Sequence, residues 1–279
     1  MNGFNEFVSA REIWQVPLTA SILAGALLGA LGVFVVLRRT VFVSAALTQL
    51  STVGLVLALL VHERLRIESE STSSQLVVAI AFSVAGALVL GAFRSRRLPA
   101  EAAVGGVWVA ASALVVLGVS RLLVHEAHDL GGMVFGNAVA VPLPDLVVIG
   151  GVALLCLVLH ALFAKELAFV SFDPETALAL GMNVSFWDGL LFLTIGLAIP
   201  VTARALGALP VFAFLTLPAG AALLARARFR SAFLVAAILG MVAAGGGYVL
   251  SWIWELPTGA TMVALAGLLL LPGAMVKRG

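Results

Sequence analysis

The chain has 279 residues, of which 62% are hydrophobic and only 11% are charged, and its net charge is +2. Soluble domains carry about 25% charged residues, so this composition excludes an ordinary water-soluble protein. Basic residues fall at the ends of apolar stretches rather than in one patch, so we expect no binding to nucleic acid. The single cysteine, Cys156, excludes an internal disulfide and a thiolate metal cluster. We therefore expect a multi-pass membrane protein in contact with lipid.

Nine apolar stretches approach the length of about 20 residues that a membrane helix needs. None shows the alternation of barrel strands, so the sequence predicts an all-α fold with eight to nine transmembrane helices in one domain over residues 1–279. Between residues 187 and 225 the sequence predicts a bent or discontinuous helix pair, broken into short pieces by Pro200, Gly207, Pro210, Pro218 and Gly220. In chain order the stretches are 17–37, 41–61, 76–93, 102–124, 144–164, 187–203, 208–225, 231–253 and 257–275.

The distribution of lysine and arginine predicts the orientation of these helices. If the connecting loops alternate, Arg11, Arg64, Arg66, Arg121 and Arg204 lie on one side of the membrane. All other basic residues then lie on the opposite side, which we expect to face the cytoplasm. With nine spans, the N-terminus is outside and the C-terminus is inside.

The chain lacks the motifs of several enzyme classes. It has no G-x-x-x-x-G-K-[ST] phosphate loop, and its only lysines are Lys165 and Lys277, so we expect no ATP hydrolysis by this chain. A G-x-S-x-G nucleophile elbow is also missing. We therefore expect that the chain is not an enzyme and binds no cofactor itself.

A histidine-rich outer segment runs from His125 to Asp129 and reads HEAHD. Its histidines are three residues apart, whereas the H-E-x-x-H zinc motif places them four apart. Two interpretations remain open. The segment is either a hydrated, charged loop or a metal site formed by His125, His128 and Asp129. A metal site at His125 and His128 would also allow a different function, that of an intramembrane metalloenzyme.

The run RRTVFVSAALTQLSTVG, residues 38–54, places several polar side chains in a predicted membrane helix. Four of them follow a spacing of four, three and one residues, which puts them on one helical face. Small hydroxyl residues allow close helix packing and bond to backbone carbonyls, but a polar cluster in a membrane is also a candidate transport path. Both interpretations stay open for Ser44, Thr48, Gln49, Ser51 and Thr52.

Four stretches, in this order, resemble the membrane permease of zinc/manganese ABC importers. They are the run just quoted, RLPAEAAVGGVWVAASAL (97–114), HDLGGMVFGNAVAV (128–141), and a group comprising FDPETALALGMNV (172–184), ALGALPVFAFLTLPAGAALLA (205–225) and SWIWELPTGATMVAL (251–265). The resemblance implies a type II importer-like permease in the bacterial cytoplasmic membrane. It also implies a homodimer, two cytoplasmic ATPase subunits that bind the ATP, and a periplasmic or extracellular solute-binding protein.

The family's metal ligands within the membrane are an aspartate and a histidine one turn apart, and they align with Ala45 and Gln49. Alanine has no donor atom and a neutral amide is a poor ligand for a dehydrated dication, so the usual zinc or manganese site is not expected here. Replacement ligands would have to come from elsewhere, and the nearest candidates are at the predicted outer mouth: His125, His128, Asp129, Glu126, His62 and Glu63. Alternatively, the permease carries a different small solute or has lost metal transport.

Residues 172–184 predict a short helix on the cytoplasmic side. Asp173 is a suitable N-cap, Pro174 suits the first helical position, and Gly181 suits the C-terminal end. Together with Glu175 and Ala177, these residues give the pattern of a coupling helix that docks into a groove of an ATPase subunit. The alternative is an ordinary helix at the membrane surface.

Overall fold

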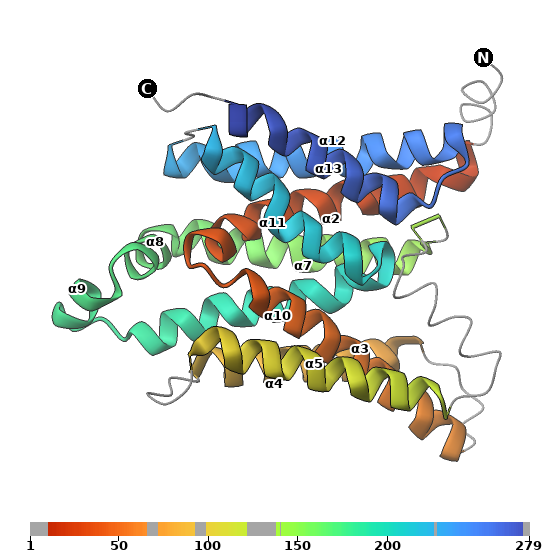
Figure 1. Cartoon of the computed structure of the whole chain (residues 1–279), viewed down its shortest axis with the longest axis horizontal. Coiled ribbons are helices and arrows are strands. Elements are labelled where there is room, and N and C mark those ends of the chain that lie inside the picture. The colour runs from red at the N-terminus through yellow and green to blue at the C-terminus, as the bar shows by residue number, and fades with distance from the viewer. Residues whose placement is uncertain are drawn as a thin grey trace. The chain divides into compact units, whose positions relative to one another are not determined.

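The computed structural model describes residues 11–65, 72–92, 99–121, 138–139, 141–225 and 228–275. Every regular element in these ranges is an α-helix, which confirms the predicted all-α class (Figure 1). In chain order the helices are α2 (Arg11–Leu37), α3 (Val41–Leu65), α4 (Thr72–Ala92), α5 (Ala100–Val119), α7 (Leu143–Leu162), α8 (Ala164–Phe172), α9 (Pro174–Ala179), α10 (Val184–Leu206), α11 (Ala208–Leu224), α12 (Phe229–Trp254) and α13 (Thr258–Met275).

Seven of these helices are long and apolar enough to cross a membrane, namely α2, α3, α4, α5, α7, α10 and α12. Two further apolar helices are shorter, at Ala208–Leu224 and Thr258–Leu271. All nine coincide with segments predicted from the sequence. The total of eight to nine spans stays a prediction, because two helices fall short of the spanning length.

The helix pair predicted for residues 187–225 is present and is interrupted at Gly207, but the prediction that its prolines break it into short pieces is wrong. Helix α10 continues through Pro200 to Leu206, and α11 continues through Pro210 and Pro218. The only interruption is Gly207, whose φ of 90° is a conformation that glycine adopts without strain. Pro210 is tolerated because it lies in the first turn of α11, where backbone N–H groups have no helical partner.

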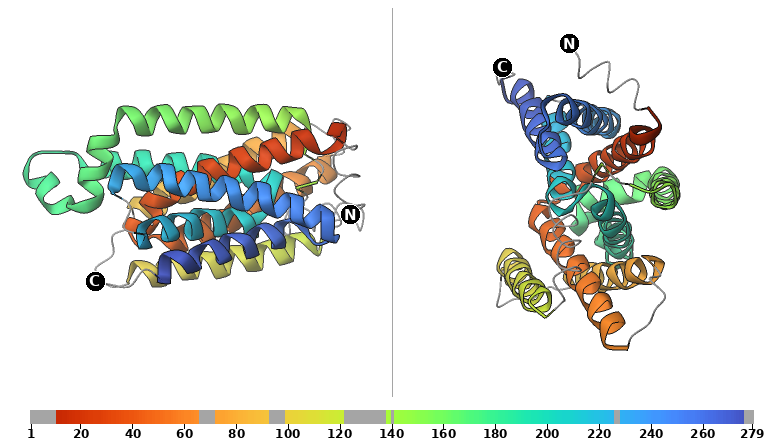
Figure 2. Two further views of the ribbon diagram at one scale, coloured as in Figure 1. Left: turned by 90° about the horizontal axis from the view of Figure 1, so that it is seen from above. Right: turned by 90° about the vertical axis from the view of Figure 1, so that its right-hand side faces the viewer.

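The chain divides into two compact units, which are described separately. Unit 1 takes its described residues from 1–39, 132–157 and 202–279, and unit 2 takes its own from 40–131 and 158–201. In unit 1, helices α2, α11, α12 and α13 pack side by side (Figures 1 and 2). Unit 2 contains α3, α4, α5, α8, α9 and most of α10, and α3 packs against both α4 and α5.

Glycine allows the helices of unit 1 to approach very closely. A Cβ added at Gly25 of α2 would lie 2.5 Å from the carbonyl oxygen of Gly240 on α12, and one added at Gly240 would meet the carbonyl of Gly25. Gly29 faces the carbonyl of Ala236, and Gly32 faces the carbonyl of Leu215 on α11, in the same way. Small residues at such crossings are the usual basis of helix packing in lipid, where apolar burial adds little.

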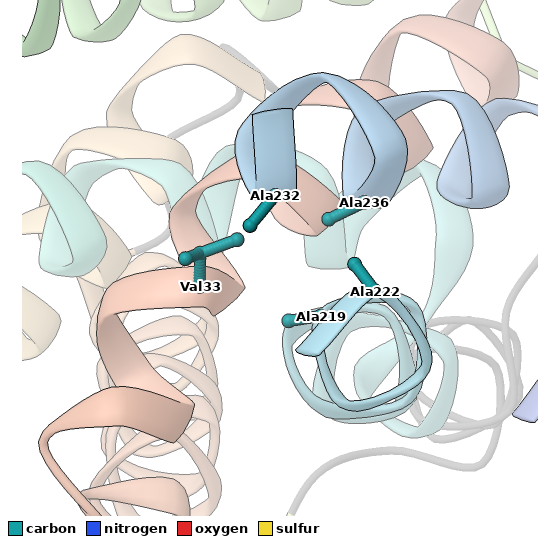
Figure 3. Close-up of a cluster of buried hydrophobic side chains, with 5 residues drawn as sticks. All are labelled: Val33, Ala219, Ala222, Ala232 and Ala236. Carbon is teal, nitrogen blue, oxygen red and sulfur yellow. The ribbon is translucent and has the colours of Figure 1, made fainter. Parts of the chain in front are cut away.

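The core beside these crossings is also built from small side chains. Figure 3 shows Val33 of α2, Ala219 and Ala222 of α11, and Ala232 and Ala236 of α12 gathered in one cluster, and each has 0% exposure. Phe34 contacts the cluster's neighbour Phe233, with ring centroids 5.0 Å apart. Alanine keeps the three backbones close, so many weak dispersion contacts form along their length.

Candidate functional site

The hydroxyls of the predicted polar face on α3 bond to their own helix. Ser44 donates to the carbonyl of Val41 at 2.6 Å, Thr48 to that of Ser44 at 2.7 Å, and Thr52 to that of Thr48 at 3.0 Å. Ser44, Thr48 and Ser51 are also buried, with 1%, 3% and 5% exposure. These contacts support the packing interpretation for the three bonded hydroxyls. A role of this face in a transport path stays a prediction.

The two positions that align with the family's metal ligands lie beside this buried face. Ala45 and Gln49 are one turn apart on α3, and both are partly exposed. Of the five polar residues predicted on this helix, Gln49 and Thr52 are partly exposed and the other three are buried. The Gln49 amide can offer a solute one carbonyl oxygen and one NH₂ group, whereas the Ala45 methyl group offers no polar atom. Neither side chain carries a charge.

Acidic and histidine side chains do not gather into a metal site within the part of the chain that the structure describes: no group of three His, Cys, Asp or Glu residues there is placed to hold an ion. The predicted outer site of His125, His128 and Asp129 lies outside the described residues. That site consequently stays a prediction.

The segment 172–184 forms a short helix with a well-defined cap at each end. The Asp173 carboxylate accepts a hydrogen bond from the backbone N–H of Thr176 at 3.0 Å, with Pro174 at the first helical position. At the other end, Gly181 has a φ of 83° and donates to the carbonyl of Leu178 at 3.0 Å. Met182 donates to the carbonyl of Ala177 at 3.0 Å, which completes a Schellman motif.

Helix α9 is fixed to its neighbours through its inner face. Ala177 has 0% exposure and packs in a small cluster with Val170 of α8 and Val184 of α10, covered by Met182 and Trp187. Figures 1 and 2 show α9 beyond the ends of α4 and α5, which belong to the same unit. The helix is therefore held in a defined orientation while its other face stays open.

The exposed side of α9 and the residues next to it in the chain carry large apolar side chains. Leu178 is 65% exposed and Leu180 is 70% exposed. In the sequence they are flanked by Phe172 at the end of α8, with 61% exposure, and Phe186 in the first turn of α10, with 58%. Glu175, in the first turn of α9, is also exposed. Exposed apolar residues of this kind are typical of a contact with another protein or with the membrane surface, so both predicted interpretations of the segment stay open. We call Phe172, Leu178, Leu180 and Phe186 the α9 patch.

The charged form of Asp173 is the better N-cap for α9. Hydrogen bonds from the Thr176 side chain and backbone hold the pKa of this carboxyl below its ordinary value of 3.8. A lowered folded-state pKa means that the cap stabilises α9 above pH 3.8, and that this contribution is lost as the pH falls through the folded-state value.

We expect Asp173→Ala to loosen α9 without unfolding the permease. The substitution leaves the Thr176 N–H without its acceptor, so amide exchange at Thr176 should rise about fivefold at pH 7. Hydrogen exchange followed by mass spectrometry measures this, and Asp173→Asn is the matched control because asparagine also caps. Unchanged exchange in the alanine variant would show that the cap does not hold this helix.

An ion pair in unit 1 was not predicted from the sequence. Arg204, in the last turn of α10, contacts Asp145, in the first turn of α7, with 3.0 Å between Nε and Oδ2. The two side chains are only 17% and 14% exposed. Both residues belong to unit 1, and the pair connects α7 to the corner at Gly207.

The chain is similar to known membrane transport proteins over nearly its whole length. Residues 10–277 match the family described as the ABC 3 transport family. The chain is 29% identical over 267 residues to the "Manganese transport system membrane protein MntC" of Halalkalibacterium halodurans, covering 95% of this chain and 87% of the relative. It is 26% identical over 273 residues to the "Manganese import system permease protein ScaB" of Streptococcus gordonii, covering 97% and 92%.

A solved structure shares the fold. The chain resembles a chain of "PsaBC from Streptococcus pneumoniae in complex with Fab" with a TM-score of 0.84 at 24% identity, covering 99% of this chain and 96% of that one. The match to the family covers nearly every residue, from before α2 to beyond α13. The chain therefore belongs to the ABC 3 transport family.

Proposed function

We propose that the chain is the membrane permease subunit of an ABC importer for divalent metal ions of the manganese and zinc type. Membership of the ABC 3 transport family supports transport, and the names of the two manganese-system relatives support the substrate class. The permease works as a homodimer in the bacterial cytoplasmic membrane. Its partners are two cytoplasmic ATPase subunits and a solute-binding protein on the outer side.

The observation that carries this proposal is the geometry of α9. A capped helix with a buried inner face and an exposed apolar outer face suits docking into a groove on a motor subunit. Glu175, which is exposed in the first turn of α9, supplies a charge that a basic residue of the partner can pair with. ATP binding by the partner then displaces α9, and α10 follows because only four residues separate the two helices.

Transport on this proposal occurs by alternating access, in which the path opens first to one side and then to the other. Gln49 faces the path from the partly exposed side of α3, next to Ala45. Ser44, Thr48, Ser51 and Thr52 support that surface from behind, since three of their hydroxyls are already bonded within the helix.

A second candidate function is import of a different small solute. It is favoured by Ala45 and Gln49, which cannot replace the carboxylate and imidazole that bind a dication in the family. On this alternative the fold and the motor are retained, and the solute is one that a neutral amide can recognise. The same two residues would also suit a permease that has lost metal transport.

Restoring the family's ligands distinguishes the two candidates. The variant Ala45→Asp with Gln49→His is compared with wild type and with the neutral control Ala45→Ser with Gln49→Asn, by uptake of radioactive manganese into cells. The metal proposal predicts uptake by wild type. Manganese uptake by the Asp/His variant alone would contradict the metal proposal and support a different solute.

A further inference from the structure

Ser83 of α4 is a completely buried hydroxyl. It has 0% exposure, and its Oγ has no hydrogen-bond partner among the residues that the structure describes. Serine in a membrane helix usually donates to a carbonyl three or four residues earlier, as Ser21 of α2 does to Pro17 at 2.8 Å. An unpartnered buried hydroxyl is costly, so this position needs a physical explanation.

A complementary group lies on α10. Pro200 has no N–H, so the carbonyl of Gly196, four residues earlier, cannot receive its usual helical hydrogen bond. Gly196 and Pro200 are both buried. In membrane helices, serine or threonine side chains from neighbouring helices commonly satisfy carbonyls that proline has freed.

Gly196 contacts α4 at the turn that carries Ser83. A Cβ added at Gly196 would lie 3.1 Å from Cβ of Ala87, 3.2 Å from Cα of Val84 and 3.4 Å from the carbonyl oxygen of Ser83. Only glycine allows the two backbones to come this close without displacing a neighbour. The unpartnered hydroxyl and the freed carbonyl are therefore on adjoining turns of two packed helices within unit 2.

The directions of the two groups also agree. Gly91 of α4 packs against Phe192 of α10, whereas Gly196 packs against the Ser83 turn, so the two helices are antiparallel. Helical carbonyls point toward the C-terminal end of a helix, and side chains tilt toward the N-terminal end. In this antiparallel pair, the C-terminal direction of α10 is the N-terminal direction of α4. The Gly196 carbonyl and the Ser83 side chain are therefore both directed toward the level of Pro200.

We propose that Ser83 is a positioning residue for α10, whose hydroxyl donates to the Gly196 carbonyl when α10 bends at Pro200. In the conformation described here, the Ser83 hydroxyl does not make this hydrogen bond. The border between the two units crosses α10 between Val201 and Thr202, directly after Pro200, where a bend would redirect the last turn. The hydrogen bond would thus stabilise one of two conformations that alternating access requires, and only this consequence rests on the proposed function.

The first test measures the bend itself. Spin labels are attached at Val77 of α4 and Leu209 of α11, which are 64% and 51% exposed, in a Cys156→Ser background. Double electron–electron resonance of the full-length chain should give two populations of the distance between the labels. Ser83→Ala should shift their ratio about fivefold to tenfold toward the conformation described here, as expected for loss of one hydrogen bond.

The matched control is Ser21→Ala, because Ser21 is equally buried but its hydroxyl is bonded within its own helix. We expect it to leave the ratio unchanged, and Ser83→Cys to have an intermediate effect, since a thiol is a weaker donor. A single distance population in wild type, or an equal ratio in wild type and Ser83→Ala, would overturn the inference.

A double-variant experiment separates hydrogen bonding from packing. Pro200→Ala restores the N–H that can bond the Gly196 carbonyl, so Ser83→Ala should have no further effect in that background. An equal effect of Ser83→Ala in both backgrounds would contradict the proposed bond. Two populations that respond to Ser83→Ala, with no manganese uptake by wild type, would refute the proposed function but not this inference.

Discussion

Gly25→Leu should prevent the permease from folding. Its Cβ would lie 2.5 Å from the Gly240 carbonyl and 2.9 Å from Cβ of Ala244, and the remaining leucine atoms would extend further into α12. Neither obstacle can rotate away, since one is backbone and the other is an alanine methyl group. Separating α2 from α12 would also open the alanine-rich core beside the crossing, so the cost should exceed about 3 kcal/mol.

Yield and thermal unfolding of the detergent-purified chain measure this effect. The matched control is Gly151→Leu on α7, in the same unit, because a Cβ at Gly151 meets nothing within 4 Å. We expect normal yield for the control and little or no folded protein for Gly25→Leu. Equal yields and unfolding temperatures for the two variants would show that this crossing does not hold unit 1 together.

Leu178→Asp should abolish the response to the ATPase while leaving the permease folded. Leu178 is 65% exposed and is not a core residue, and the substitution places a charge on the exposed side of α9. An unpaired charge in a desolvated interface typically costs enough to weaken binding by more than about tenfold. We expect Glu175→Arg to act in the same direction by reversing the charge in the first turn of α9.

Co-purification of the ATPase with the tagged permease, together with manganese uptake, measures this loss. Ser231→Asp is the control, because it adds the same charge at an exposed residue of α12 on the predicted cytoplasmic side. The docking role would be disproved by Leu178→Asp protein that retains its ATPase and transports normally.

The sequence was sufficient to predict features that depend on local chemistry. Apolar stretches of about 20 residues define membrane helices whatever their neighbours are, so the all-α class followed from hydropathy. The caps of α9 at Asp173, Pro174 and Gly181 could also be predicted, because their hydrogen bonds join residues that are close in the sequence. Leu178 and Leu180 in a polar connection could also have indicated the α9 patch.

Features that depend on packing between distant residues could not be predicted in this way. The spacing of Ser44, Thr48 and Ser51 located a helical face but could not tell whether its hydroxyls were already bonded. Proline content suggested a break at Pro200, whereas α10 continues through it. The partners of Gly25 and Arg204 are far away in the sequence, and no local pattern identifies them.

Manganese uptake is the most direct test of the central claim, that this chain is the membrane path of an importer driven by a separate ATPase. Cells lacking the gene are compared with cells carrying wild type or Leu178→Asp, under metal limitation. The account predicts that wild type restores energy-dependent accumulation of manganese and that Leu178→Asp does not. Identical accumulation in all three strains would contradict it.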